Sequence, residues 1–262
     1  SHVMAALIRK FLIAQEKKLS TVSCWGSGNA EREFLHVDDL SEAIIFCIEN
    51  WHPIVNDAPK DINPGRIKAF KAINNILNWP HEYSAIAKPL INKFLGPDLA
   101  IQSKLNLSIQ MPRDKTSILS MHTDSLSGQS IFEMVLWVPL TDSFETNSMY
   151  IFSKEKTNQI LNQLKNSETI GMKKIFDKYK KHANYLKLNF GECLIFSPTL
   201  FHGNTLNQTN ITRVSINCRF KNLFSHEPTN GERRLGSFYK VLNISPVTKI
   251  GLEYRQDLIN FL

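Results

Sequence analysis

Several features that would assign this chain to a common class are missing from its sequence. No apolar run approaches the ~18 residues that a membrane-spanning helix requires, so we expect no membrane span. No Arg-rich tract and no aromatic-plus-basic module is present, which argues against nucleic-acid binding. We find no signal peptide and no C-x-x-C pair, and the widely spaced cysteines predict a reduced, cytoplasmic protein. The four cysteines are Cys24, Cys47, Cys193 and Cys218.

The composition is typical of a globular protein. The 262 residues allow one large domain or two modest ones, and 42% hydrophobic with 21% charged residues allows a sizeable core. The formal net charge is +7, from 31 Lys+Arg against 24 Asp+Glu. A lysine-rich solvated surface is the simpler interpretation of this charge, and attraction to anions such as nucleotide-sugars or phosphates is the alternative.

The first part of the chain has the pattern of a small α/β segment. Apolar residues at helical spacing predict helices over residues 3–18 and 40–50, and TVSCW and EFLHV predict short strands between them. Because the chain begins inside this helical pattern, we expect it to be a piece of a longer protein or a processed form. Residues 51–66, rich in Pro and Asn, are the best candidate for a linker.

The rest of the chain begins with helical patterns over residues 68–79 and 81–95. From about residue 103 it changes to short segments that are rich in β-branched and aromatic residues and bounded by turn residues. This predicts a sandwich or barrel rather than a parallel sheet. The strand-rich region is interrupted by a helical insertion over 154–183, and we expect its lysines to line a solvated face. The strand-like segments are SKLNLSIQM, TSILSMH, IFEMVLWVPL, SMYIF, YLKLNF, ECLIFS, TRVSINCRF and GSFYKVLNI.

A histidine and an aspartate separated by one residue form the most informative motif. On an extended strand, His122 and Asp124 point to one face and can reach one ion, and His202 follows a later strand-like run. Two imidazoles and one carboxylate can bind one face of a ferrous ion and leave three positions open for a co-substrate and O₂. By itself, H-x-D is more often a surface histidine beside an aspartate.

Arg213 strengthens the metal hypothesis. A co-substrate that chelates iron through a 2-oxo acid needs a partner for its distal carboxylate, and the planar, permanently charged arginine suits it. Ser215 faces the same side of the strand and can add a hydroxyl. A surface ion pair for Arg213 and a strand-face hydroxyl for Ser215 are the ordinary alternatives.

The runs HTDSLSGQSIFEMVLWVPLTDSFETNSMYIF and GECLIFSPTLFHGNTLNQTNITRVSINCRF resemble the Fe(II)/2-oxoglutarate-dependent oxygenases, in particular the phytanoyl-CoA-hydroxylase-like branch of carbohydrate biosynthesis clusters. The resemblance covers roughly residues 66–245. It implies a double-stranded β-helix, iron held by His122, Asp124 and His202, and 2-oxoglutarate anchored by Arg213 with Ser215. For the other carboxylate of 2-oxoglutarate the candidates are Asn204, Trp137 and Tyr150, although a turn residue and core aromatics are the favoured interpretations of these three.

The run SHVMAALIRKF and the later VSCWGSGNAEREFLHVDDLSEAIIFCIEN resemble the carboxy-terminal part of GDP-L-fucose synthase, in the NAD-dependent epimerase/dehydratase family. The resemblance places His2 near the nicotinamide cofactor and Lys10, Trp25 and Arg32 on the GDP-sugar. Neither the glycine-rich dinucleotide fingerprint nor a Tyr-x-x-x-Lys pair in the right context is present, so we expect no reductase activity. A truncated fusion, a gene remnant and a module that docks on a neighbour all stay open as explanations.

These patterns predict a mainly β fold with flanking helices, a jelly-roll or cupin-like double-stranded β-helix, and a small N-terminal α/β segment. The expected division is residues 1–50, a linker over 51–66, and an oxygenase domain over 67–262. The predicted function is oxidation of a sugar, nucleotide-sugar or related metabolite, with Fe(II) and 2-oxoglutarate as cofactors and no nucleic-acid or membrane partner. A homo-oligomer stays open, and so do two other functions: an NADP-dependent epimerase–reductase fragment and a non-catalytic β-barrel binding module. We expect the loops 125–131, 141–148 and 222–236 to set specificity.

Overall fold

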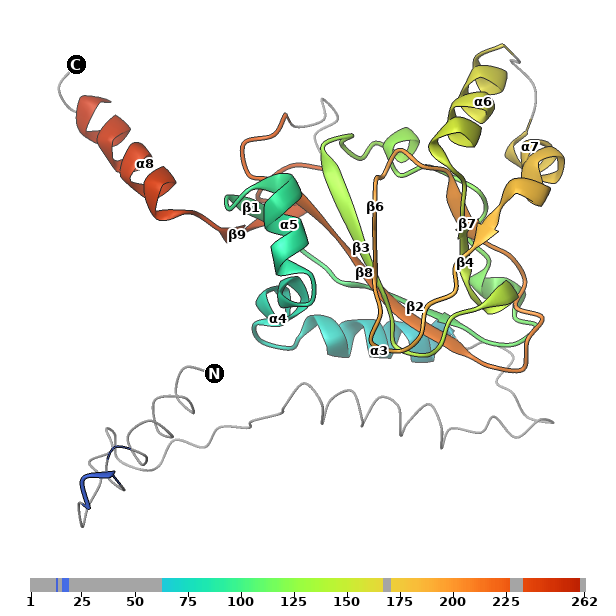
Figure 1. The fold of residues 1–262 in the computed structure, drawn as a ribbon, viewed down its shortest axis with the longest axis horizontal. Coiled ribbons are helices and arrows are strands. Elements are labelled where there is room, and N and C mark those ends of the chain that lie inside the picture. The colour runs from blue at the N-terminus through green and yellow to red at the C-terminus, as the bar shows by residue number, and fades with distance from the viewer. Residues whose placement is uncertain (1–12, 14–15, 19–62, 167–170, 227–232, 260–262) are drawn as a thin grey trace. The chain divides into compact units, whose positions relative to one another are not determined.

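The fold was analysed in a computed structural model, which describes residues 13, 16–18, 63–166, 171–226 and 233–259 (Figure 1). The chain divides into two compact units, Ser1–Cys47 and Ile48–Leu262, and nearly all of the described residues belong to the second. The predicted elements over 3–50 and the linker over 51–66 lie almost wholly outside the described residues. So do the N-terminal ligand candidates His2, Lys10, Trp25 and Arg32.

In the described part of the chain, three short helices precede the sheets. The single helix predicted over 81–95 is wrong, because the chain forms two helices with a break before Pro89. Proline has no N–H to donate, and its ring clashes with the carbonyl of the fourth residue before it, here Ala85, where the first of the two helices ends. Trp79, Tyr83 and Ile91 from this pair are buried in the main core. The helices are α3 (Asn63–Asn74), α4 (Trp79–Ala85) and α5 (Lys88–Leu95).

The larger sheet has six antiparallel strands in the order β6-β3-β8-β1-β9, with β2 also paired to β8. Its central strand β8 alternates between polar and apolar residues from Arg213 to Lys221. The apolar face (Val214, Ile216, Cys218, Phe220) is buried, mostly in the main core, and the opposite face carries polar side chains. The strands are β1 (Leu99–Gln102), β2 (Asn106–Gln110), β3 (Glu133–Pro139), β6 (Leu194–Phe196), β8 (Arg213–Asn222) and β9 (Tyr239–Asn243).

The smaller sheet has three antiparallel strands in the order β5-β4-β7. The described part of the fold is therefore sheet-rich and antiparallel with flanking helices, as predicted, and its strand pairing does not close into a barrel. The strands are β4 (Met149–Ile151), β5 (Asn184–Tyr185) and β7 (His202–Asn204).

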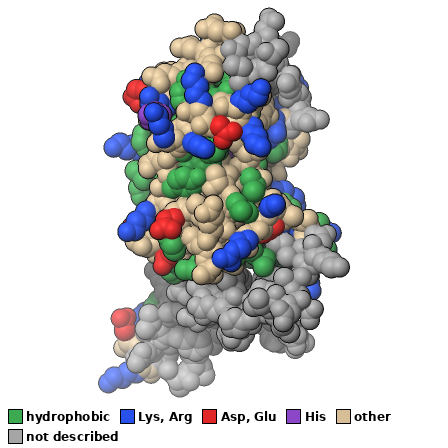
Figure 2. All heavy atoms as spheres, turned by 90° about the vertical axis from the view of Figure 1, so that its right-hand side faces the viewer, with side chains coloured by type: hydrophobic (Ala, Val, Ile, Leu, Met, Phe, Trp, Pro, Cys, Tyr) green, Lys and Arg blue, Asp and Glu red, His purple; other side chains and the backbone are tan. Residues whose placement is uncertain are grey.

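The 154–183 insertion forms two helices, as predicted, and they pack on the smaller sheet. Their buried residues Ile160 and Ile175 join Tyr150, Phe152 and Phe201 in a second core. Figure 2 shows this side of the molecule, where Lys and Arg side chains outnumber acidic ones. The exposed lysines of the insertion include Lys154, Lys165, Lys173, Lys174, Lys178, Lys180 and Lys181. The helices are α6 (Lys154–Lys165) and α7 (Met172–Tyr179), and the first begins at the capping residue Ser153.

Several predicted strands are shorter than expected or absent. The predicted strand over 116–122 is largely a loop, because the side chains of Asp114 and Asn204 accept hydrogen bonds from the backbone N–H groups of Thr116 and Leu119. Helix α8 (Pro246–Ile259) was not predicted. The 3-10 turns are η1 (Lys115–Ser117), η2 (Ser125–Ser127), η3 (Glu145–Asn147) and η4 (Lys180–His182). Among the described residues, no helix has the length and apolar character that crossing a membrane requires.

Candidate metal centre

The two histidines of the motif lie directly opposite each other on adjacent chain segments. His122 and His202 form an antiparallel bridge in which each backbone N–H donates to the other's carbonyl, at 3.0 and 2.9 Å. Residues that exchange both bonds carry their side chains on the same face. The ring centroids are therefore only 4.3 Å apart, as predicted for two strands that lie side by side.

Both imidazole rings are held so that Nε2 is available to a metal ion. Nδ1 of His122 lies 2.8 Å from the carbonyl oxygen of Ser120, and Nδ1 of His202 lies 2.9 Å from that of Leu200. A carbonyl oxygen can only accept, so each Nδ1 carries the hydrogen when the ring is neutral. Each Nε2 then keeps its lone pair for a metal ion.

The pKa of His202 is lowered to about 4, first by burial and then by the neighbouring His122. The ring is therefore neutral near pH 7, which is the form that binds metals. The hydrogen bond to the Leu200 carbonyl and the charge of Asp124 act in the opposite direction and raise this pKa, but burial outweighs both.

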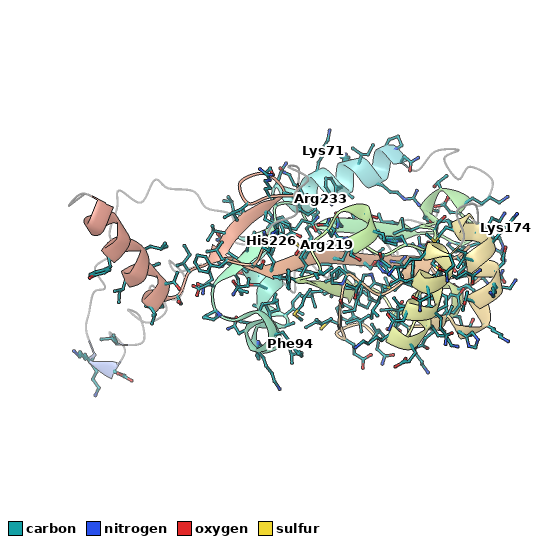
Figure 3. The ribbon with its side chains drawn as sticks, turned by 90° about the horizontal axis from the view of Figure 1, so that it is seen from above. Lys71, Phe94, Lys174, Arg219, His226 and Arg233 are labelled. Carbon is teal, nitrogen blue, oxygen red and sulfur yellow. The ribbon has the colours of Figure 1, made fainter. Side chains whose placement is uncertain are left out.

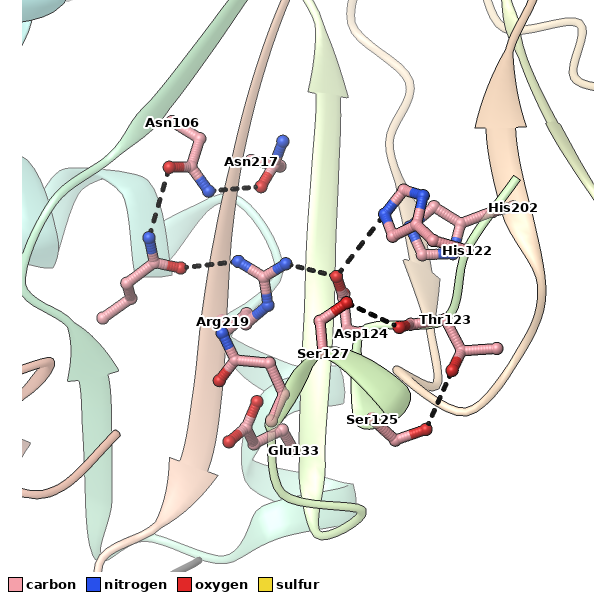
Figure 4. Close-up of polar contacts among 12 residues, drawn as sticks. Asn106, His122, Thr123, Asp124, Ser125, Ser127, Glu133, His202, Asn217 and Arg219 are labelled. Atoms are coloured by element: carbon pink, nitrogen blue, oxygen red, sulfur yellow. Dashed lines mark hydrogen bonds and ion pairs between the residues drawn. The ribbon is translucent and has the colours of Figure 1, made fainter. Parts of the chain in front are cut away.

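Asp124 completes the set, although not from a strand. Its backbone is helical at the start of η2, so the prediction that a strand face carries it beside His122 is wrong. A turn brings it there instead: Oδ1 lies 3.8 Å from Nε2 of His122 and 2.6 Å from Nη2 of Arg219 (Figure 4). One candidate ligand atom from each of His122, Asp124 and His202 lies within 4.8 Å of the others.

The donor set fits a divalent transition-metal ion. Oδ2 of Asp124 is buried and has no hydrogen-bond partner, and a buried carboxylate oxygen is costly unless it is paired. Two imidazole nitrogens and one carboxylate are ligands that iron and its neighbours in the first transition row accept. Among the described residues, this is the one cluster with such a set.

A cavity of about 270 Å³ opens at the three residues. Its lining comes from both sheets, and it includes His202 of the small sheet and Arg213, Asn217 and Arg219 from the polar side of β8. Val135, Trp137, Met149 and Phe196 supply an apolar part of the wall. The polar residues of the wall include Asn106, Ser108, Asn204, Arg213, Asn217 and Arg219.

Arg213 is a buried cation in this wall, with a relative exposure of 2%. Its Nε donates to the Asn147 carbonyl at 2.7 Å, Nη1 donates to the Ser215 hydroxyl, and Nη2 donates to Oε1 of Gln110 at 3.0 Å. All three acceptors are neutral, and no described carboxylate forms an ion pair with the guanidinium. Burial lowers the pKa of Arg213 to about 10, so it stays charged at neutral pH. A buried charge without a counter-ion suits an anionic ligand.

The three candidates for the second co-substrate contact differ in position. Asn204 lines the cavity, but its amide is engaged with the 117–119 loop: Nδ2 donates to the Ser117 carbonyl at 3.0 Å, and Oδ1 accepts from Leu119 N–H. Trp137 lines the cavity, with the Arg213 guanidinium 5.8 Å from its ring centroid. Tyr150 is a buried aromatic of the second core and does not belong to the lining.

Sequence reasoning missed Arg219, which contacts Asp124 directly. It also missed the amide side chains of Gln102, Asn106 and Asn217, which form a hydrogen-bonded row with that arginine. The alternation R-x-S-x-N-x-R in β8 was a usable signal, because it places Arg213, Ser215, Asn217 and Arg219 on one face. Gln102 on β1 belongs to no comparable alternation in the sequence.

Comparison with known proteins gives different relatives for the two parts of the chain. Residues 1–63 match the NAD dependent epimerase/dehydratase family. "Probable GDP-L-fucose synthase 1" of Oryza sativa subsp. japonica is 49% identical over 51 residues, which are 20% of this chain and 16% of the rice protein. The chain thus spans about a sixth of the length of that relative. "Streptomycin biosynthesis protein StrG" of Streptomyces griseus is 25% identical over 151 residues, 56% of this chain and 60% of that protein.

Solved structures with a similar arrangement include metal-binding proteins. One is described as "Non-heme monooxygenase, ThoJ-Ni complex", with a TM-score of 0.46 and 18% identity over 71% of this chain and 74% of that one. Another is HygX from Streptomyces hygroscopicus with nickel and 2-oxoglutarate bound, with a TM-score of 0.44 and 10% identity over 68% of this chain and 87% of that one.

Proposed function

We propose that residues 67–262 form an Fe(II)- and 2-oxoglutarate-dependent oxygenase with a double-stranded β-helix fold. One observation carries the proposal: His122, Asp124 and His202 converge at a cavity whose wall also holds Arg213, a buried cation with no carboxylate partner among the described residues. One cavity thus has metal ligands for the chelating end of a co-substrate and a buried cation for its other, negatively charged end.

Each residue has a role in this assignment. Nε2 of His122, Nε2 of His202 and the Asp124 carboxylate hold the ion, while the hydrogen bonds to Ser120 and Leu200 keep both rings oriented. Arg213, with its neighbour Ser215, binds the distal carboxylate of 2-oxoglutarate. When bound, Fe(II) and 2-oxoglutarate supply an O₂-dependent oxidation that converts 2-oxoglutarate to succinate and CO₂. The apolar part of the cavity wall excludes water from this reaction.

We propose a sugar, nucleotide-sugar or related carbohydrate as the substrate. Asn106, Ser108 and Asn217 give one part of the cavity wall amide and hydroxyl groups, which suit a ligand with many hydroxyls. Two relatives support the same class by association: one is named for streptomycin biosynthesis, and the other is a GDP-L-fucose synthase that resembles the N-terminal segment.

Anaerobic titration of the Fe(II)-loaded protein with 2-oxoglutarate tests the site. We expect a metal-to-ligand charge-transfer absorption that His122→Ala abolishes. If wild type shows no such band and His122→Ala changes nothing, the assignment is wrong. Succinate release with a panel of GDP- and other nucleotide-sugars then tests the substrate class, and mass spectrometry of the product separates hydroxylation from epimerisation, because only hydroxylation adds an oxygen atom.

The match of residues 1–63 to the epimerase/dehydratase family favours a second candidate, a nucleotide-sugar epimerase–reductase activity of a longer protein. We expect no such turnover from this chain, because the sequence contains no glycine-rich dinucleotide fingerprint. NADPH oxidation with a GDP-4-keto-sugar is the measurement, and turnover would establish the second candidate.

A further inference from the structure

Arg219 connects the candidate metal centre to the large sheet. It lies on β8 with a side chain that is 13% exposed, and Figure 3 shows it within the body of the fold, whereas Lys174 and Phe94 lie at the periphery. Its Nη2 donates to Oδ1 of Asp124 at 2.6 Å, and its Nη1 donates to Oε1 of Gln102 at 3.0 Å. The two ends of one guanidinium therefore hold the candidate ligand and strand β1 at once.

A row of amides fixes the direction of this guanidinium (Figure 4). Arginine can only donate, so Gln102 must present its oxygen to Arg219 and its Nε2 to the next residue. That Nε2 donates to Oδ1 of Asn106 at 3.3 Å, and Nδ2 of Asn106 donates to Oδ1 of Asn217 at 2.9 Å. Strands β1, β2 and β8 each contribute to the row, and turning Arg219 away from Asp124 would also break its hydrogen bond to Gln102.

The Asp124 carboxylate consequently has two unequal oxygens. Oδ1 is held by a charge-assisted hydrogen bond, whereas Oδ2 is buried without a hydrogen-bond partner. A free carboxylate can bind a metal ion through one oxygen or through both. A carboxylate that is tied to a fixed guanidinium loses the freedom to turn both oxygens towards the ion.

We propose that Arg219 is a positioning residue that restricts Asp124 to binding the metal ion through one oxygen. The proposal rests on the oxygenase function argued above. With one atom from each of His122, Asp124 and His202, a bound ion would keep positions open for other ligands, and a second oxygen from Asp124 would take one of them. Arg219 would therefore act through Asp124, by keeping open the space that a bidentate co-substrate and a third ligand need.

The test compares Arg219→Gln with wild type in two titrations: Co²⁺ by calorimetry, and 2-oxoglutarate against the Fe(II)-saturated protein by anaerobic absorption. In Arg219→Gln we expect the Co²⁺ affinity to stay within about threefold, because a repelling charge is lost along with the orienting bond. We expect the 2-oxoglutarate affinity to fall about tenfold or more. Arg219→Lys should recover part of that loss, because an ammonium still donates to Asp124.

Arg113→Gln is the matched control, since Arg113 is exposed and its one side-chain bond, to Asn210, is 3.4 Å long. Unchanged 2-oxoglutarate binding in Arg219→Gln overturns the proposal, and so does loss of Co²⁺ binding by a folded Arg219→Gln protein. If wild type itself binds no Co²⁺, the oxygenase assignment fails instead. If Arg219→Gln does not fold, Gln102→Leu is the alternative variant, because it removes the hydrogen bond between Gln102 and the Arg219 guanidinium. The same two titrations then apply, and we expect a smaller loss of 2-oxoglutarate affinity, of about threefold.

Discussion

Gly203 lies so close to Tyr150 that any side chain would force a shift: a Cβ at Gly203 would be 2.7 Å from the Tyr150 hydroxyl and 2.8 Å from the carbonyl oxygen of Leu119. Gly203 follows the candidate ligand His202 in strand β7. A side chain at Gly203 would therefore push on the same strand that carries His202. We expect Gly203→Ala to cost about 1–3 kcal/mol of unfolding free energy, the usual range for overpacking. We also expect it to weaken Co²⁺ binding, because His202 moves with the strand.

Gly65→Ala provides the matched control. A Cβ at Gly65, in helix α3, would meet nothing within 4 Å, and alanine favours helices, so stability should stay equal or rise by up to about 1 kcal/mol. Chemical denaturation and Co²⁺ calorimetry give both readouts. Full Co²⁺ affinity in Gly203→Ala would show that β7 absorbs the methyl group without moving His202.

Arg213 provides the second prediction. Arg213→Lys keeps the charge but loses the planar fork, and we expect it to weaken 2-oxoglutarate binding by about 10–100-fold, equivalent to about 1.4–2.7 kcal/mol. Metal binding should not change, because Arg213 contacts Asn147, Ser215 and Gln110 rather than a candidate ligand. A thermal shift measures the same effect: at about 100 times its dissociation constant, 2-oxoglutarate adds about 2.7 kcal/mol to wild-type stability. The variant should gain far less at that concentration, and an equal gain would place the co-substrate elsewhere.

The sequence alone indicated the candidate ligands and Arg213. Their side chains can bind a metal ion or an anion, and their spacing along the chain suggested that they act together. His122 and His202 do lie side by side, and Ser215 does share a face with Arg213. The polar alternation of β8 is likewise visible in the letters.

What the sequence could not show depends on contacts between distant segments. Asp124 reaches the site through a turn, and periodicity does not predict where a turn aims a side chain. Arg219 meets Asp124 and Gln102 only because β8 lies beside β1 and near η2, and that pairing is a property of the whole sheet. The loop at 117–119 similarly replaces a predicted strand because one side chain, Asn204, takes over its hydrogen bonds.

Asn204 provides the third prediction, which separates two roles. Its amide clamps the 117–119 loop through Ser117 and Leu119, so Asn204→Ala leaves a backbone carbonyl and a backbone N–H without those bonds. We expect a loss of about 1–3 kcal/mol of unfolding free energy. The 2-oxoglutarate affinity of the folded, metal-saturated variant should change by less than about threefold if the clamp is the main role. A tenfold or larger loss of affinity with unchanged stability would instead make Asn204 a direct co-substrate contact.

Glu133, a buried carboxyl on β3, makes stability depend on pH. Burial is the largest cause that raises its pKa, opposed by hydrogen bonds from Tyr239 and from the Ser130 N–H and by the charge of Arg219. The folded protein therefore binds the proton of the Glu133 carboxyl more tightly than the unfolded chain does. As pH rises from the unfolded pKa of this group through its folded pKa, the protein loses the stability that the protonated carboxyl contributes. Glu133→Gln mimics the protonated carboxyl and removes that loss.

We therefore expect Glu133→Gln to match wild type below the unfolded pKa of glutamate, about 4.3, and to become the more stable protein as pH rises towards 7. Denaturant unfolding of the metal-free protein at a series of pH values measures the difference. Glu82→Gln, at an exposed position of α4, controls for the loss of one negative charge and should follow wild type throughout. A Glu133→Gln protein that is less stable than wild type at pH 7 would mean that the charged carboxylate stabilises the fold through Arg219 and Lys221 by more than its burial costs.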